Sequence, residues 1–261
     1  MSSLETLSLV LALALAAPSA PALAWSENFN GEFQNAWTFG FLDDVGDPPD
    51  AGSFSASATN DILLISASDA ALADGGGGPA FAFGYVDQTF GTSFVRGSVN
   101  VGSSPSPVNQ LALVARGNAS NGTAYLFGMD FDSGVLLLGR SDSVSGDVVG
   151  LASGTADAFL AGQSYWLELD AVGSQITGRA YTAAGGTLLD TLSATDATYS
   201  QGVAGVIVQA YDLDGVVVGA PLRGTFDDLS AVPEPSSAAL LAVGLVLLGG
   251  ARARTREGST A

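Results

Sequence analysis

The chain contains no cysteine and no histidine, and these two absences remove whole classes of chemistry. Without cysteine it has no disulfide framework, no thiolate nucleophile and no Cys-ligated zinc or iron–sulfur centre. Without histidine it has no Ser-His-Asp triad, no imidazole metal site and no side chain that ordinarily titrates near neutral pH. Lysine is also absent, which excludes a Schiff base and a P-loop lysine. Carboxylates are therefore the ordinary general acids and bases that remain.

Charged residues are scarce and strongly unbalanced. They make up 13% of the 261 residues, and 26 Asp and Glu stand against 8 Arg, for a net charge of −18. A chain this acidic, with no basic run in its middle, lacks the electrostatic footprint of a nucleic-acid-binding protein. The length allows one β domain of about 200 residues together with targeting segments.

The N-terminal segment has the pattern of a secretory signal peptide. An apolar run, LSLVLALALAA (7–17), precedes a small-residue step at Ala22 and Ala24, and polar, strand-like sequence follows directly. This order predicts residues 1–24 as a signal peptide that signal peptidase removes. The first residues are atypical, because they carry a glutamate and no arginine. A buried or membrane-anchored helix is the alternative interpretation.

The C-terminal segment combines a Pro-Glu-Pro breaker, an apolar stretch and an arginine cluster. The apolar stretch, 236–250, is short for a membrane span, since a bilayer core requires about 20 residues. Its place before a terminal arginine cluster nevertheless predicts a transmembrane helix with the arginines on the cytoplasmic side. The residues that flank this stretch are Val232, Pro233, Glu234 and Pro235 before it and Arg252, Arg254 and Arg256 after it.

This arrangement resembles a PEP-CTERM sorting signal (232–256), with a short tail (257–261) behind it. The resemblance implies export in a Gram-negative bacterium that makes exopolysaccharide. It also implies a transient stay in the inner membrane, cleavage near Pro-Glu-Pro by an exosortase, and delivery to the cell surface or extracellular matrix. A plain C-terminal membrane anchor is the alternative.

Apolar and polar residues alternate throughout the segment 25–231, the expected domain. Candidate strands such as 92–101, 110–116 and 163–172 recur roughly every 10 to 15 residues, with Gly, Asn, Asp and Ser between them. This pattern predicts an all-β fold, a two-sheet antiparallel jelly-roll sandwich. A signal helix at the N-terminus and a hydrophobic helix at the C-terminus are expected to flank it.

The hairpin at 163–181 shows its two faces most clearly. Its apolar set is expected to face the core, because a one-residue slip would bury two carboxylates and an arginine. The opposite set then points outward. The apolar set includes Leu167, Leu169, Ile176 and Ala180, and the outward set includes Trp166, Arg179 and Tyr181.

The order of segments resembles the concanavalin A-like lectin/glucanase jelly roll in its laminin-G-like bacterial form. The matching features are an opening strand with Phe29, a following Trp37, and the segments LALVARGNASNGTAYLFGMDF, GVLLLGR, YWLELDAVGSQITGRAY and TFDDLS. The fold hosts lectins, glycosidases, adhesion modules and structural domains, so it does not assign a function by itself.

Retaining glucanases of this fold carry Glu-x-Asp-x-x-Glu on one concave strand. The comparable residues here are Glu168 and Asp170, and the third carboxylate would fall at Gly173. A solvated strand face explains such a pair without catalysis. We therefore expect a protein that is not an enzyme, with a glycoside hydrolase or lyase as the alternative.

No cofactor is required by the sequence, and calcium is the one candidate. Sandwiches of this type often hold a structural Ca²⁺ between the first and last strands, and the resemblance makes Glu27 and Asp228 its expected ligands. Acidic clusters also serve simply to keep a surface soluble, which is the alternative.

Sugar binding calls for aromatic side chains and arginines on an open sheet face. Two of the candidate residues are arginines that suit uronate carboxylates, while the net charge favours a neutral or weakly acidic glycan. Ordinary cross-strand pairing is the alternative. The candidates are Arg116, Tyr125, Trp166, Arg179 and Tyr181.

The function expected from these observations is a non-catalytic carbohydrate-binding or structural component linked to exopolysaccharide. A purely structural matrix or adhesion subunit without a small ligand is a third possibility beside the enzyme.

Overall fold

The computed structural model describes most of the central segment. The expected signal helix, the sorting segment from Glu234 onward and the helix expected at 236–250 lie outside the described residues. Within the described part, no helix is long and apolar enough to cross a membrane. The described residues are 24–42, 54–59, 62–67, 80–91, 93–100, 110–118, 120–130, 134–142, 148–155, 162–210 and 222–233.

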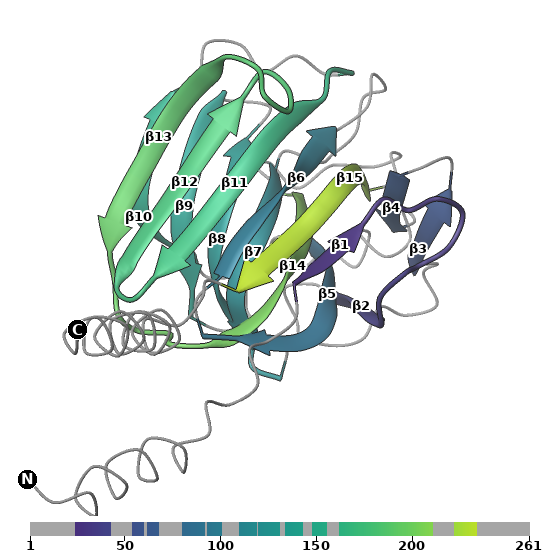
Figure 1. Cartoon of the computed structure of the whole chain (residues 1–261), viewed down its shortest axis with the longest axis horizontal. Coiled ribbons are helices and arrows are strands. Elements are labelled where there is room, and N and C mark those ends of the chain that lie inside the picture. The colour runs from purple at the N-terminus through teal and green to yellow at the C-terminus, as the bar shows by residue number, and fades with distance from the viewer. Residues whose placement is uncertain are drawn as a thin grey trace, which may run out of the picture. The chain divides into compact units, whose positions relative to one another are not determined.

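Two antiparallel sheets face each other (Figure 1). The first, which we call sheet A, has the strand order β13-β12-β11-β6-β15-β4-β3, with β1 paired to β15. Its strands are β1 (Trp25–Glu27), β3 (Phe54–Thr59), β4 (Ile62–Ala67), β6 (Ser93–Asn100), β11 (Tyr165–Val172), β12 (Gln175–Tyr181), β13 (Leu188–Thr195) and β15 (Leu222–Pro233).

The second, sheet B, lies behind sheet A in Figure 1 and has the order β10-β9-β8-β7-β14-β5-β2. All strand pairs are antiparallel, which confirms the expected all-β sandwich. Its strands are β2 (Trp37–Leu42), β5 (Ala80–Phe90), β7 (Gln110–Asn118), β8 (Thr123–Asp130), β9 (Val135–Ser141), β10 (Val148–Thr155) and β14 (Gly202–Ala210).

The core lies between the sheets and follows the alternation of the strands. In the β11–β12 hairpin the expected core residues are all fully buried, while the expected outward residues Trp166, Arg179 and Tyr181 are half-buried on the opposite face. Sheet B contributes Leu113, Phe127 and Val206, which are also fully buried. The expected facing of this hairpin is therefore confirmed, and it leaves the outer face of sheet A to polar and aromatic side chains.

The β11–β12 hairpin closes through Gly173 and Ser174, as the register Val172 opposite Gln175 requires. Gly173 has a φ of 57°, a value that favours glycine, and Ser174 has no positive φ. A positive φ at the first central residue alone is the geometry of a type II′ turn, whose twist matches that of the strands it joins. The turn therefore holds β11 and β12 in register and aligns their outward side chains.

Candidate functional site

The outer face of sheet A brings aromatic and charged side chains together on three adjacent strands. In the hairpin, Trp166 lies opposite Tyr181 and Glu168 lies opposite Arg179. On the other side of β11, Glu168 lies opposite Arg96 of β6. Arg96 is exposed, and the other four are half-buried. We call these five residues the β11 patch.

Glu168 is the centre of the β11 patch, because both aromatic side chains bind its carboxylate. The Trp166 Nε1 donates to Glu168 Oε1 at 3.3 Å, and the Tyr181 hydroxyl donates to Oε2 at 3.1 Å. Burial and then the Glu168 charge raise the pKa of Tyr181, so the phenol stays protonated and remains a donor. The indole, the phenol and the carboxylate thus hold one another in place.

Asp170 follows Glu168 on the same face of β11. It lies opposite Thr177 of β12 and Phe94 of β6. Its Oδ1 is buried without a hydrogen-bond partner, and burial raises the pKa of this carboxyl. The third position of the glucanase pattern is Gly173, which the structure places in the hairpin turn.

Arg116 does not lie on this face but in the interior, where it is 2% exposed. Its Nη1 donates to the carbonyl oxygens of Gly173 and Tyr199 at 2.8 Å each, and Nη2 donates to that of Ala171 at 2.9 Å. The side chain thus ties β7 of sheet B to the β11–β12 turn. The prediction that Arg116 lies on an open sheet face is therefore wrong. The reason is that β7 has a register shift after Ala115 and that Arg116 itself has a φ of 52°. Alternation does not continue through such an irregularity.

Tyr125, the other residue expected on an open face, is fully buried in β8 of sheet B. Its hydroxyl donates to Asp196 Oδ1 at 2.6 Å and accepts from the backbone N–H of Tyr199 at 3.1 Å. Tyr125 lies on the core face of β8 together with Phe127 and Met129. The sequence shows that these three residues share one face of a strand, but it does not show which sheet the strand joins or which of its faces is buried. Tyr125 therefore belongs to a different cluster.

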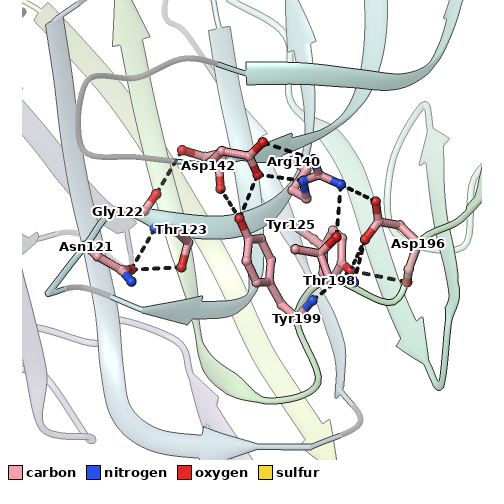
Figure 2. A network of polar contacts seen from close by, with 10 residues as sticks. Asn121, Gly122, Thr123, Tyr125, Arg140, Asp142, Asp196, Thr198 and Tyr199 are labelled. Carbon is pink, nitrogen blue, oxygen red and sulfur yellow. Dashed lines mark hydrogen bonds and ion pairs between the residues drawn. The ribbon is translucent and has the colours of Figure 1, made fainter.

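That cluster is a polar network that joins the end of β9 to the loop between β13 and β14 (Figure 2). Arg140 forms ion pairs with Asp142 and Asp196, and its Nη1 also donates to the Thr198 hydroxyl at 3.0 Å. The Tyr199 hydroxyl donates to Asp142 Oδ1 at 2.8 Å. Arg140 and Asp142 are partly exposed, at 20% and 40%, but these polar groups already satisfy one another, which suits a structural role more than a ligand site. No motif in the sequence marks this network.

The calcium site expected at Glu27 and Asp228 does not fit the structure. Glu27 is 1% exposed, and its carboxylate accepts hydrogen bonds from N–H groups of Gln34, Asn35 and Trp37. These donors occupy the lone pairs that a cation would need and present positive dipole ends to it. Asp228 is exposed, and among the described residues no group of three or more acidic side chains is placed to hold a metal.

No family model matches this chain, and no curated protein matches it in sequence. Solved structures do match. The chain is 14% identical to the carbohydrate binding module CBM66 from Bacillus subtilis, with a TM-score of 0.52 over 77% of this chain and 96% of that one. It is 10% identical to lectin II from Ulex europaeus, with a TM-score of 0.53 over 82% and 99%.

A protein of unknown function with a galectin-like fold, also from Bacillus subtilis, is 13% identical, with a TM-score of 0.52 over 81% of this chain and 96% of that one. Identities this low show the fold alone. The described part of this chain has a jelly-roll-like sandwich fold that lectins and carbohydrate binding modules share.

Proposed function

We propose that this protein binds carbohydrate without catalysis and that the β11 patch is its binding face. The observation that carries the proposal is the pairing of Trp166 and Tyr181 across two strands, both hydrogen-bonded to Glu168. Aromatic rings offer a flat apolar surface with a polar edge, which suits the apolar face of a sugar ring. Three side chains that are already fixed also lose little conformational entropy when a ligand binds.

The charged members of the patch supply the hydrogen bonds that a hydroxylated ligand needs. An ionised carboxylate has about four acceptor sites, and the two aromatic donors leave Glu168 with further capacity for sugar hydroxyls. Arg179 and Arg96 add donors on either side of it. The likeness of the fold to a carbohydrate binding module and a lectin supports this proposal at the level of the fold.

The test is a glycan array with the purified full-length chain, followed by affinity measurement of Trp166→Ala against Tyr85→Ala. Tyr85 is a matched control, because it is a half-buried aromatic residue on the outer face of sheet B, stacked on Phe83 at 6.2 Å. We expect Trp166→Ala to weaken binding by about fivefold to tenfold, since an aromatic contact contributes about 1–1.5 kcal/mol. Tyr85→Ala should bind as the wild type does.

Three outcomes would count against this assignment. If Tyr85→Ala loses binding and Trp166→Ala does not, the binding face is on sheet B. If no glycan is bound, the chain is a structural component and the proposal is wrong. If reducing sugar is released from a bound glycan, and Glu168→Gln abolishes the release, the protein is a hydrolase.

We further propose that the protein is exported and sorted through its two ends. The signal-peptide pattern of 1–24 and the Pro-Glu-Pro, apolar and arginine segments of 232–256 support this proposal. Signal peptidase and an exosortase would be its processing partners, and the cell surface or an exopolysaccharide matrix its destination. At the cell surface or in an exopolysaccharide matrix, a carbohydrate-binding protein would meet polysaccharide ligands.

A further inference from the structure

Two arginines of the β11 patch lack the ion pairs that an acidic protein readily supplies. The chain has 26 acidic residues, yet in its described part both ion pairs belong to Arg140. Arg116 is buried and bonded to backbone carbonyls. Among the arginines whose side chains the structure describes, Arg96 and Arg179 remain; neither has a carboxylate within ion-pair distance, and the Asp170 charge acts on Arg179 only at longer range. The protein has a net charge of −18, so two arginines without ion pairs on one face suggest that they bind something outside the chain.

The same two arginines lie in one row across the sheet. Arg179 of β12 and Arg96 of β6 are the two register partners of Glu168, one on each side of β11. Neighbouring strands are about 4.8 Å apart, so the two arginine Cα atoms are separated by about 10 Å. Arginine side chains are long enough to converge above a central residue at that spacing.

Glu168 forms no ion pair with either arginine, because its carboxylate accepts hydrogen bonds from Trp166 and Tyr181 instead. Arg96 has two contacts with neighbouring side chains: its Nε donates to the Ser230 hydroxyl at 3.1 Å, and its guanidinium lies 5.6 Å from the centre of the Phe94 ring. Both contacts leave the two terminal nitrogens of Arg96 for another acceptor. A guanidinium fork fixed in this way matches the geometry of a carboxylate.

Resting on the proposed function, we infer that the β11 patch binds acidic glycans, with the carboxylate of a uronic acid residue held by Arg179 and Arg96. The aromatic pair lies two residues along the strand from the arginine row, a distance of about 7 Å. That distance allows one sugar ring to cover Trp166 while the acid group of the same or the next residue reaches the arginines. Glu168 then accepts from sugar hydroxyls between the two.

The negative net charge of the chain repels an acidic glycan, but this repulsion acts mainly at long range. Charges farther away than about 10 Å are largely screened at moderate ionic strength, whereas a guanidinium–carboxylate pair at contact distance is not. The four charges of the patch and its neighbour Asp170 sum to zero, two arginines against two carboxylates. The local field at this face is therefore not that of the whole protein.

The experiment compares each uronate oligosaccharide with its own carboxyl-reduced form, in which only the acid group changes. Oligogalacturonate, oligoglucuronate and alginate oligomers are the probes, and titration calorimetry with the full-length chain measures the affinities. We expect the wild type to prefer one acidic probe over its carboxyl-reduced form by about tenfold, because hydrogen bonds to an ionised carboxylate are stronger than those to a neutral hydroxyl. Arg179→Gln should remove most of this preference while the reduced form still binds. Arg179→Lys, which keeps the charge and loses the fork, should restore only part of it.

The outcomes separate this inference from the proposed function. Equal affinity for acidic and reduced probes would overturn the inference and leave carbohydrate binding intact. A preference that survives in both Arg179→Gln and Arg96→Gln would place acid recognition elsewhere and would also overturn it. Failure of every acidic and neutral glycan to bind would end both proposals together.

Discussion

Asp196 is the residue on which the polar network at the end of the sandwich converges. Its side chain is 9% exposed, and its carboxylate accepts hydrogen bonds from Tyr125, Arg140 and the backbone N–H of Thr198. Burial alone would raise the pKa of Asp196, but these hydrogen bonds outweigh it and hold the pKa well below the ordinary range of an aspartate. The folded protein therefore binds this proton more weakly than the unfolded chain does.

A depressed carboxyl pKa makes stability depend on pH in a definite direction. The contribution of Asp196 is fully present above the unfolded-state pKa of about 4 and is lost as the pH falls toward the folded-state value. Asp196→Asn should therefore lower the free energy of unfolding at pH 7, and its difference from the wild type should shrink below about pH 4. Urea unfolding at pH 7, 4 and 2.5 measures this difference. A constant difference across that range would show that Asp196 is not linked to acid stability.

At the scale of elements, strand β12 depends on a glycine for its contact with sheet B. A Cβ atom added at Gly178 would lie 2.1 Å from Cδ2 of the Phe127 ring. Phe127 of β8 is fully buried, so its ring can move aside only by displacing the side chains packed around it. Gly178 therefore lets the two sheets approach each other beneath the β11 patch.

Gly178→Ala should destabilise the protein by about 1–3 kcal/mol, since overpacking forces a buried ring or a strand to shift. Gly150→Ala in β10 is the matched control, because a Cβ there would meet only Leu137 Cδ1, at 3.8 Å. That substitution should be neutral or slightly stabilising, because alanine restricts the unfolded chain. Thermal melting compares the two variants. Equal melting temperatures would mean that the Phe127 ring adjusts without cost.

At the scale of the whole molecule, the described sandwich begins and ends at neighbouring points. Trp25 opens β1, is 4% exposed, and its ring meets that of Trp37 edge to face at 5.5 Å. It pairs with Ala231 of β15, and β15 ends at Pro233, which pairs with Ser93 of β6. Cleavage before Trp25 and after Pro233 would therefore leave both strands whole.

We expect the exported protein to have Trp25 as its N-terminus and to have lost the segment after Pro-Glu-Pro in a host with an exosortase. Replacing Glu234 and Pro235 by alanine should leave an uncut, membrane-held form. Intact-mass measurement of the exported wild type and the variant checks both ends. Recovery of Met1 in the exported protein, or equal release of the variant, would contradict the sorting proposal.

The sequence by itself determined the class of fold and the facing of the β11–β12 hairpin. Both rest on the two-residue period of a strand, which is a local property of the chain. Leu167 and Ile176 are buried and Trp166 and Tyr181 lie on the opposite face for this reason. The turn at Gly173 is equally local, since its φ depends on a few neighbouring residues.

Only the tertiary structure decided which residues meet. Arg116 and Tyr125 have strand-like neighbours, but a bulge in β7 and the position of sheet B carry them into the interior. Arg96 joins the β11 patch because β6 pairs with β11, a contact between segments far apart in sequence. Periodicity sets the faces of each strand, whereas strand order and bulges arise from packing of the whole chain. The members of the candidate site follow from that packing.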